Sequence, residues 1–162
     1  MSSIAVDRHT ITVDTIGQTN ANTFTVYLNE PLKNVLQAKL LAAHVHTTDA
    51  VQHCYVSVDE LDTIFSERTK QDLNAQGAIS KVNRSFASLI SEATTHTGSD
   101  QLITFKNHYP IEHTYSTPIR RLDRLTVSLR DHTGNTIPNA SVAGNNFLVF
   151  DIACQNSALI LP

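Results

Sequence analysis

A short run of strict alternation in the last third of the sequence constrains the fold most. Between positions 125 and 129 the apolar side chains are Leu125, Val127 and Leu129, and polar residues stand between them. A period of two places the apolar side chains on one face of a β-strand and the polar ones on the other. Residues 131–135 then supply Asp, Gly and Asn, which favour a reversal of the chain. The run therefore predicts a half-buried strand that ends in a turn.

The same period recurs in other segments of the chain. Each segment has apolar residues at alternate positions, which predicts antiparallel strands with one face toward a core and the other toward water. The predicted inward residues are Phe24, Val26 and Leu28; Cys54, Val56 and Val58; and Leu148, Phe150, Ile152 and Cys154. Shorter extended pieces are predicted at 10–15, 84–90, 101–106 and 113–116, the first as an edge strand or a docking arm.

Residues 34–47 permit two interpretations. Leu36 and Leu40 stand at helical spacing, whereas the Val, His and Thr residues that end the segment are typical of a pleated strand. Because the neighbouring segments are strands, we expect a long strand, joined by a turn at 48–50 to the strand that begins at His53, as a hairpin. About eight or nine strands without a long helix are typical of a sandwich or barrel.

Length and charge place the chain among ordinary single-domain proteins. A chain of 162 residues with 41% apolar content can form one domain that buries about 70% of its unfolded surface. The net charge of -3 gives no reason to expect attraction to nucleic acid or to a membrane. We expect one domain over 1–162, with 1–8 as a flexible arm and 62–83 as a long inter-strand loop.

The two cysteines, Cys54 and Cys154, both fall at inward positions of predicted strands. No apolar signal segment opens the sequence and no run of 18 apolar residues occurs, so we expect a soluble protein of a reducing compartment. In that setting two buried thiols are favoured over a disulfide. Neither cysteine nor any serine stands in a nucleophile motif, and no catalytic residue is nominated.

A metal hypothesis rests on His44 and His46, which share one strand face. Such a pair can supply two ligands of a zinc or iron site, as in cupin enzymes with a jelly-roll fold. Those enzymes add a Glu a few residues later and a further His, whereas here the next acid, Asp49, lies on a predicted turn. Polar or partly buried histidines are therefore favoured, and no metal or cofactor is expected.

Two charged clusters could have a function, but a structural role is favoured for both. Asp59, Glu60 and Asp62 could act as an acid and base pair or bind Ca²⁺, but a solvated strand terminus is favoured because no calcium loop pattern is present. A basic group could bind phosphates or a neighbour's carboxylates. It comprises Arg120, Arg121, Arg124 and Arg130. The adjacent Asp123 and Asp131 favour ordinary surface pairing.

Two patterns in the last third of the chain resemble a known family. Leu-x-Val-x-Leu-Arg-Asp-x-x-Gly-Asn runs from Leu125 to Asn135, and Phe-Leu-x-Phe-x-Ile runs from Phe147 to Ile152. They resemble the final two strands of small jelly-roll capsid proteins from double-stranded DNA viruses whose major capsid protein is a double jelly roll. These are large eukaryotic DNA viruses and virophages. The segments 22–32 and 35–41 are similar to the opening strands of that family, so the likeness covers a little over a third of the chain.

The resemblance implies a single jelly-roll sandwich of about eight antiparallel strands, acting as a penton. Five copies would form a homopentamer at each icosahedral vertex of the virion, beside major capsid capsomers and minor capsid proteins. It implies assembly inside the host cell, without catalysis, membrane span or direct contact with nucleic acid. The chain shows neither a second jelly roll nor a large inserted domain, which argues against the major capsid protein.

Two alternatives come from other functional classes. One is a receptor- or carbohydrate-binding jelly roll, which usually displays aromatic side chains on a groove. The sequence has no Trp, and its tyrosines are Tyr27, Tyr55, Tyr109 and Tyr115. The other is the cupin-type metalloenzyme that would depend on His44 and His46.

Overall fold

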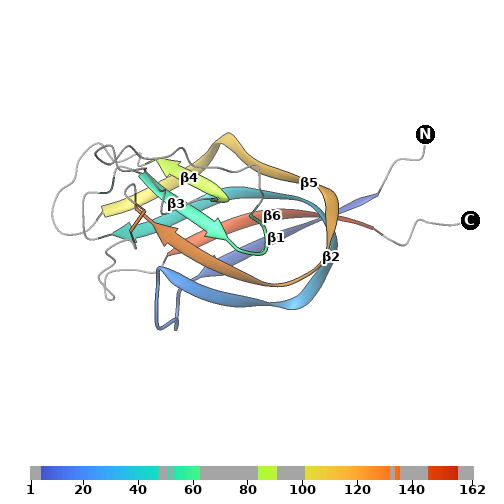
Figure 1. The fold of residues 1–162 in the computed structure, drawn as a ribbon, viewed down its shortest axis with the longest axis horizontal. Helices are drawn as coiled ribbons and strands as arrows, with labels where there is room; N and C mark the ends of the chain where they lie inside the picture. The colour runs from blue at the N-terminus through green and yellow to red at the C-terminus, as the bar shows by residue number, and fades with distance from the viewer. Residues whose placement is uncertain are drawn as a thin grey trace, which may run out of the picture.

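The described residues form an all-β domain with no helix, as predicted. The computed structural model describes residues 5–47, 51, 53–62, 84–90, 101–131, 134–135 and 146–156. Its strands are β1 (Val6–Asp14), β2 (Thr23–Thr47), β3 (His53–Val58), β4 (Ala87–Ile90), β5 (Gln101–Arg130) and β6 (Phe147–Gln155) (Figure 1). All neighbouring strands are antiparallel, in the order β1-β6-β2-β5-β3-β4.

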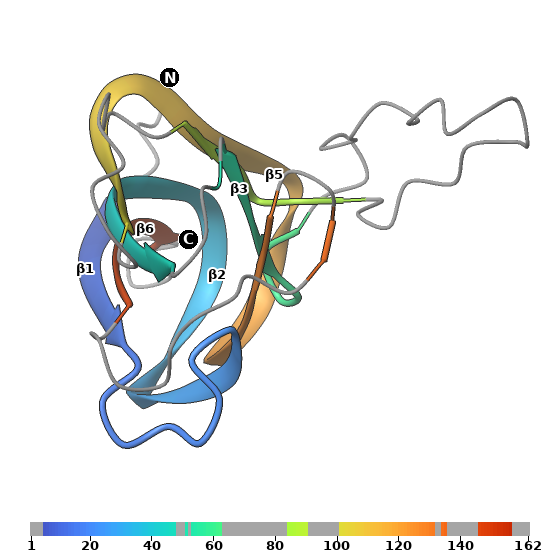
Figure 2. The ribbon, with the colours of Figure 1, turned by 90° about the vertical axis from the view of Figure 1, so that its left-hand side faces the viewer.

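This order curls into two layers because β2 and β5 each run through both of them (Figure 2). The first layer consists of β1, β6, residues 35–47 of β2 and residues 101–119 of β5. The second layer consists of residues 23–27 of β2, residues 122–130 of β5, β3 and β4. Each layer thus has four strand segments in the pattern of a jelly roll. Within the described residues the six strands are fewer than predicted, because each half of β2 and of β5 resembles a separate strand.

The bend in β2 lies where its register with β5 shifts, between Tyr27 and Leu32. Pro31 falls inside this shift and has no N–H to donate to a ladder. Just beyond it, Asn34 has a φ of 52°, a left-handed conformation that Asn tolerates better than most residues. These local features turn the strand from one layer into the other.

The core lies between the layers and contains the side chains that the alternation placed inward. Leu125, Val127 and Leu129 are buried, as are the inward residues of β3 and β6. Phe24 is also buried, whereas Val26 and Leu28 are partly buried and pack against the same core. Full burial of one such aliphatic or aromatic side chain stabilises the fold by about 1.5–3 kcal/mol. The prediction of the inward faces is confirmed.

A buried asparagine, Asn146, joins three parts of the fold just before β6. Its backbone N donates to Thr15 Oγ1 at 3.0 Å, and its Nδ2 donates to Ala21 O at 2.7 Å. Its Oδ1 accepts from the backbone N of His46 at 2.9 Å. Asn146 therefore holds the turn after β1 and the end of β2 against the start of β6.

The predicted turn at 131–135 is confirmed. Gly134 has a φ of 85°, and its N donates to Asp131 O at 2.9 Å. The carboxylate of Asp131 accepts from the backbone N of Asn135 at 2.9 Å. The turn chemistry expected after β1 is present as well, where Gly17 has a φ of 76°.

Other local predictions need correction. The hairpin with a turn at 48–50 is wrong, because within the described residues β3 pairs with β4 and β5 and is not a neighbour of β2. The expected flexible arm over 1–8 is wrong for Val6–Arg8, since these residues begin β1 and Arg8 forms an ion pair with Asp151 of β6.

The described residues cover two other local predictions only in part. Of the strand expected at 84–90, Ala87–Ile90 forms β4. Apart from Asp62, the long loop expected at 62–83 lies outside the described residues. The described part of the chain has no helix long and apolar enough to cross a membrane.

Candidate interaction surface

Each layer ends in two edge strands, which carry backbone groups available for pairing with another chain. In the described structure the first layer ends in β1 on one side and in residues 101–119 of β5 on the other. The two edges differ in regularity. β1 pairs with β6 in unbroken register from Val6 to Asp14, whereas the register between β5 and β2 shifts twice along this layer.

A groove of about 630 Å³ separates the β1 edge from the bend of β2. Its apolar lining comes from Ile11, Leu28 and Leu32, beside the exposed Tyr27, whose side chain stands at the groove with a residue exposure of 74%. Apart from Pro31 and Cys154, the rest of the lining is polar or charged, with both signs of charge present. It comprises Asp7, His9, Thr10, Thr12, Asn29, Glu30, Pro31, Lys33, Cys154, Gln155 and Asn156. The groove therefore combines an open strand edge with three aliphatic side chains in a largely polar lining, a combination that can receive an extended polypeptide.

The four arginines of the predicted basic group lie in the bend of β5 and in the second half of the same strand. Arg121 Nε donates to Asp123 Oδ2 at 3.3 Å, which confirms the expected surface pairing there. Both side chains are more than half exposed, so this pair contributes less than about 1 kcal/mol. Further along, Arg130 Nη1 donates to Gly134 O at 3.3 Å, so this arginine helps to close the turn after β5.

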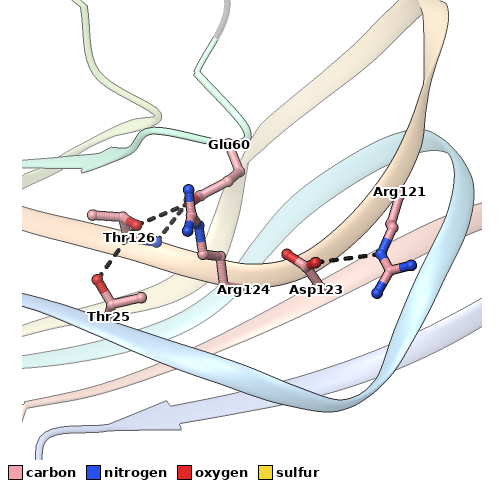
Figure 3. Close-up of polar contacts among 6 residues, drawn as sticks. All are labelled: Thr25, Glu60, Arg121, Asp123, Arg124 and Thr126. Atoms are coloured by element: carbon pink, nitrogen blue, oxygen red, sulfur yellow. Dashed lines mark hydrogen bonds and ion pairs between the residues drawn. The ribbon is translucent and has the colours of Figure 1, made fainter.

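Glu60 binds the edge of β5 beyond the end of β3 (Figure 3). Its Oε2 accepts from Thr126 N at 2.7 Å, and its Oε1 accepts from Thr126 Oγ1 at 2.9 Å. Oε1 also accepts from Arg124 Nε at 3.1 Å, and this hydrogen bond raises the pKa of Arg124. The Thr126 hydroxyl lies 3.4 Å from that of Thr25 on β2. Glu60 therefore replaces a strand partner, and the prediction of a solvated terminus is wrong for this residue.

Asp62 also has a structural partner, because its Oδ1 accepts from Val58 N at 2.9 Å. Burial raises the pKa of Asp62 to about 6, against an opposing contribution from the Val58 hydrogen bond. Nearby, Tyr115 OH donates to Leu61 O at 2.7 Å, and burial raises the pKa of Tyr115. Of the three predicted acids only Asp59 is exposed, as a solvated terminus requires.

The structure gives His44 and His46 different surroundings. His44 is exposed, with its ring centroid 6.2 Å from that of Phe147, whereas His46 is partly buried. Over the described residues no three His, Cys, Asp or Glu side chains gather where they could hold a metal ion. Asp49, the third residue of the metal hypothesis, lies outside the described residues.

Both cysteines are buried free thiols, as predicted. Burial raises the pKa of Cys54 and of Cys154, and a neighbouring charge, Asp131 or Asp7 respectively, adds to the effect. Since the thiolate is the nucleophile, these surroundings make both sulfur atoms less reactive. Cys154 contributes to the groove as a small apolar side chain.

No family model and no curated protein matches this chain. Over the described residues, the strand edge at β1 and the groove beside it form the candidate interaction surface. The sequence analysis did not bring Tyr27, Pro31 and β1 together. Only the layered topology does so, because β1 and residues 27–33 are edges of different layers.

Proposed function

We propose that this chain is a structural capsid protein, the penton subunit that forms homopentamers at the vertices of an icosahedral shell. The observation that carries the proposal is the jelly-roll topology, with four strand segments in each of two layers. The two sequence patterns that resemble small jelly-roll capsid proteins fall at the end of β5 with the turn after it and in the strand β6. These two segments lie in different layers and contribute to both sides of the core.

A ring of identical subunits needs two different surfaces on each subunit. In a heterologous contact one patch of a subunit meets another patch of its neighbour, and the ring closes when the rotation allows it. The first layer supplies such a pair of surfaces, with the regular edge at β1 and the shifted edge at 101–119 of β5. The buried core behind them makes the subunit a rigid block for this geometry.

The titratable groups with raised pKa values support a structural role. Asp62 and Tyr115 are each engaged in a hydrogen bond to the backbone near the end of β3. Cys54 lies in the core. Burial of these three groups explains why their pKa values are raised. Burial has this effect outside active sites as well.

The test is the mass of the purified full chain in solution, measured by sedimentation velocity over a range of concentrations. The monomer has a mass of 17.8 kDa, and we expect a species of five times that mass to increase with concentration. Electron microscopy of assembled particles that carry a labelled copy of this chain should place the label at the five-fold vertices. A stable dimer as the only assembled species, or a label spread over the facets, would contradict the proposal.

A second candidate is a receptor- or carbohydrate-binding module, and one observation favours it. Tyr27 is exposed at a groove, which is where such a module displays an aromatic side chain. By contrast, the hydroxyl of Tyr115 is bonded to the backbone and Tyr55 is only partly exposed. Glycan-array binding of the wild type that is lost in Tyr27→Ala would favour this candidate over the capsid proposal.

A further inference from the structure

The groove beside β1 is long enough to receive a short extended segment. Along β1 it is lined from Asp7 to Thr12, a span of six residues, or about 20 Å in a strand. The β1 edge along this span is regular, because its register with β6 is unbroken. An extended occupant could therefore pair with the outer side of β1 and place apolar side chains against Ile11, Leu28 and Leu32.

The chain itself contains a segment with matching properties. The last six residues of the sequence, 157–162, are Ser, Ala, Leu, Ile, Leu and Pro, and none of them is charged. An extended segment of six residues reaches about 20 Å, which equals the length of the groove along β1. The segment follows Asn156, which lines the end of the same groove.

The direction of β6 argues against insertion of this segment into the groove of its own subunit. β6 runs antiparallel to β1 and passes the start of that strand, where Asn156 N donates to Ala5 O at 2.9 Å. To enter its own groove the chain would have to reverse after this hydrogen bond. Residues 157–162 contain no Gly, Asn or Asp, and their only Pro is the last residue.

We propose that residues 157–162 of one copy bind as an extended strand in the β1 groove of a second copy. The proposal rests on the proposed function in one respect, since it takes the neighbour to be another copy of this chain. It adds the contact by which neighbours recognise each other. An apolar segment on one subunit meets a strand edge and an apolar groove on the next, so the contact is heterologous.

Cysteine crosslinking in the full-length chain tests this contact. All variants carry Cys154→Ala, which removes the native thiol from the groove. One protein adds Ile160→Cys, and it is mixed under mild oxidation with a second protein that carries Thr10→Cys or Thr12→Cys. Both threonines are exposed on β1 and line the groove. The matched control is Thr114→Cys, an exposed threonine on the opposite edge of the same layer.

We expect disulfide-linked heterodimers with the two β1 positions, at about ten times or more the yield of the control, because docking raises the local concentration of the thiols. Yields equal to the control would overturn the proposal. So would an intramolecular disulfide, detected by mass, in a single chain that carries Ile160→Cys and Thr10→Cys together.

The sedimentation measurement separates this result from the proposed function. Pentamers without β1 crosslinks would leave the penton proposal standing and remove the tail contact. Crosslinks in a protein that forms only dimers would support the tail contact and contradict the penton proposal.

Discussion

Replacement of Asn146 by Ala should destabilise the fold more than any other single polar substitution in the turn after β1 or the start of β6. The side chain of Asn146 is fully buried, and it serves both as a donor to Ala21 O and as an acceptor from His46 N. Alanine removes both hydrogen bonds but keeps the backbone bonds to Thr15. The substitution therefore isolates the contribution of the side chain.

The magnitude follows from the two groups that lose their partner. An unsatisfied buried polar group costs about 1–3 kcal/mol, and both His46 and Ala21 are partly exposed, so the lower part of that range applies to each. The sum is about 2–4 kcal/mol. Stability of a domain of this size lies near 5–15 kcal/mol, so the variant should still fold at room temperature.

The assay is urea unfolding followed by far-ultraviolet circular dichroism, with the same slope expected for both proteins because the same surface is exposed. Asn29→Ala is the matched control, since Asn29 is exposed in the bend of β2, and it should change stability by less than about 0.5 kcal/mol. A loss of less than about 0.5 kcal/mol in Asn146→Ala would refute the argument that this side chain holds the turn after β1 and the end of β2 against the start of β6.

Three further substitutions test other parts of the fold. Gly17→Ala should lower the stability of the fold by about 1–2 kcal/mol, because Gly17 has a positive φ that alanine adopts poorly. Gly17→Asn should lower it less, because Asn tolerates this conformation and the space around the position is open. Thermal unfolding of both variants measures the difference. Glu60→Gln should cost about 1–3 kcal/mol because one amide hydrogen-bond donor would face the donors of Thr126 or Arg124. Arg124→Gln should lower the free energy of unfolding less, because the Arg124 side chain is exposed to solvent. Equal losses in urea unfolding would contradict the role of Glu60 as a strand partner. Burial raises the pKa of Asp62 from 3.8 to about 6, so the folded state binds this proton more tightly than the unfolded state does. The free energy of unfolding of the wild type should therefore fall relative to that of Asp62→Asn as the pH rises from about 4 to about 6, and the difference should stay constant above that range. Denaturant unfolding at several pH values measures this difference, and a constant difference over the whole range would contradict the assignment.

The alternation of apolar residues predicted which side chains face the core, because a period of two is a local property of a strand. It placed Leu125, Val127 and Leu129 inward, and all three are buried. It could not predict which strands are neighbours, because pairing depends on where β2 and β5 bend. The hairpin expected at 48–50 failed for this reason, since the chain changes layer between β2 and β3.

The polar contacts were less predictable than the core, although one signal was present. Asn146 has the same phase as Leu148 and Phe150, so the period that placed those residues inward also places Asn146 inward. A polar residue at an inward position must have partners, which marks it as a structural site before any coordinates are known. For Glu60 no such signal exists, because its partner Thr126 lies on a strand that only the tertiary structure brings near.

The two edges of the first layer differ in a way that gives a direction to any assembly through them. On β5 the prolines Pro110 and Pro118 both fall where the register with β2 shifts, and they lack the N–H that an added strand would need. β1 has no proline and no register shift, but it carries the charged residues Asp7 and Arg8, which discourage pairing with an arbitrary strand. An uncharged strand with a complementary apolar face suits the β1 edge better than the β5 edge, where the two prolines interrupt the row of N–H donors. Under the proposed function, copies that meet through these two edges would use unlike surfaces, which is the condition for a closed ring.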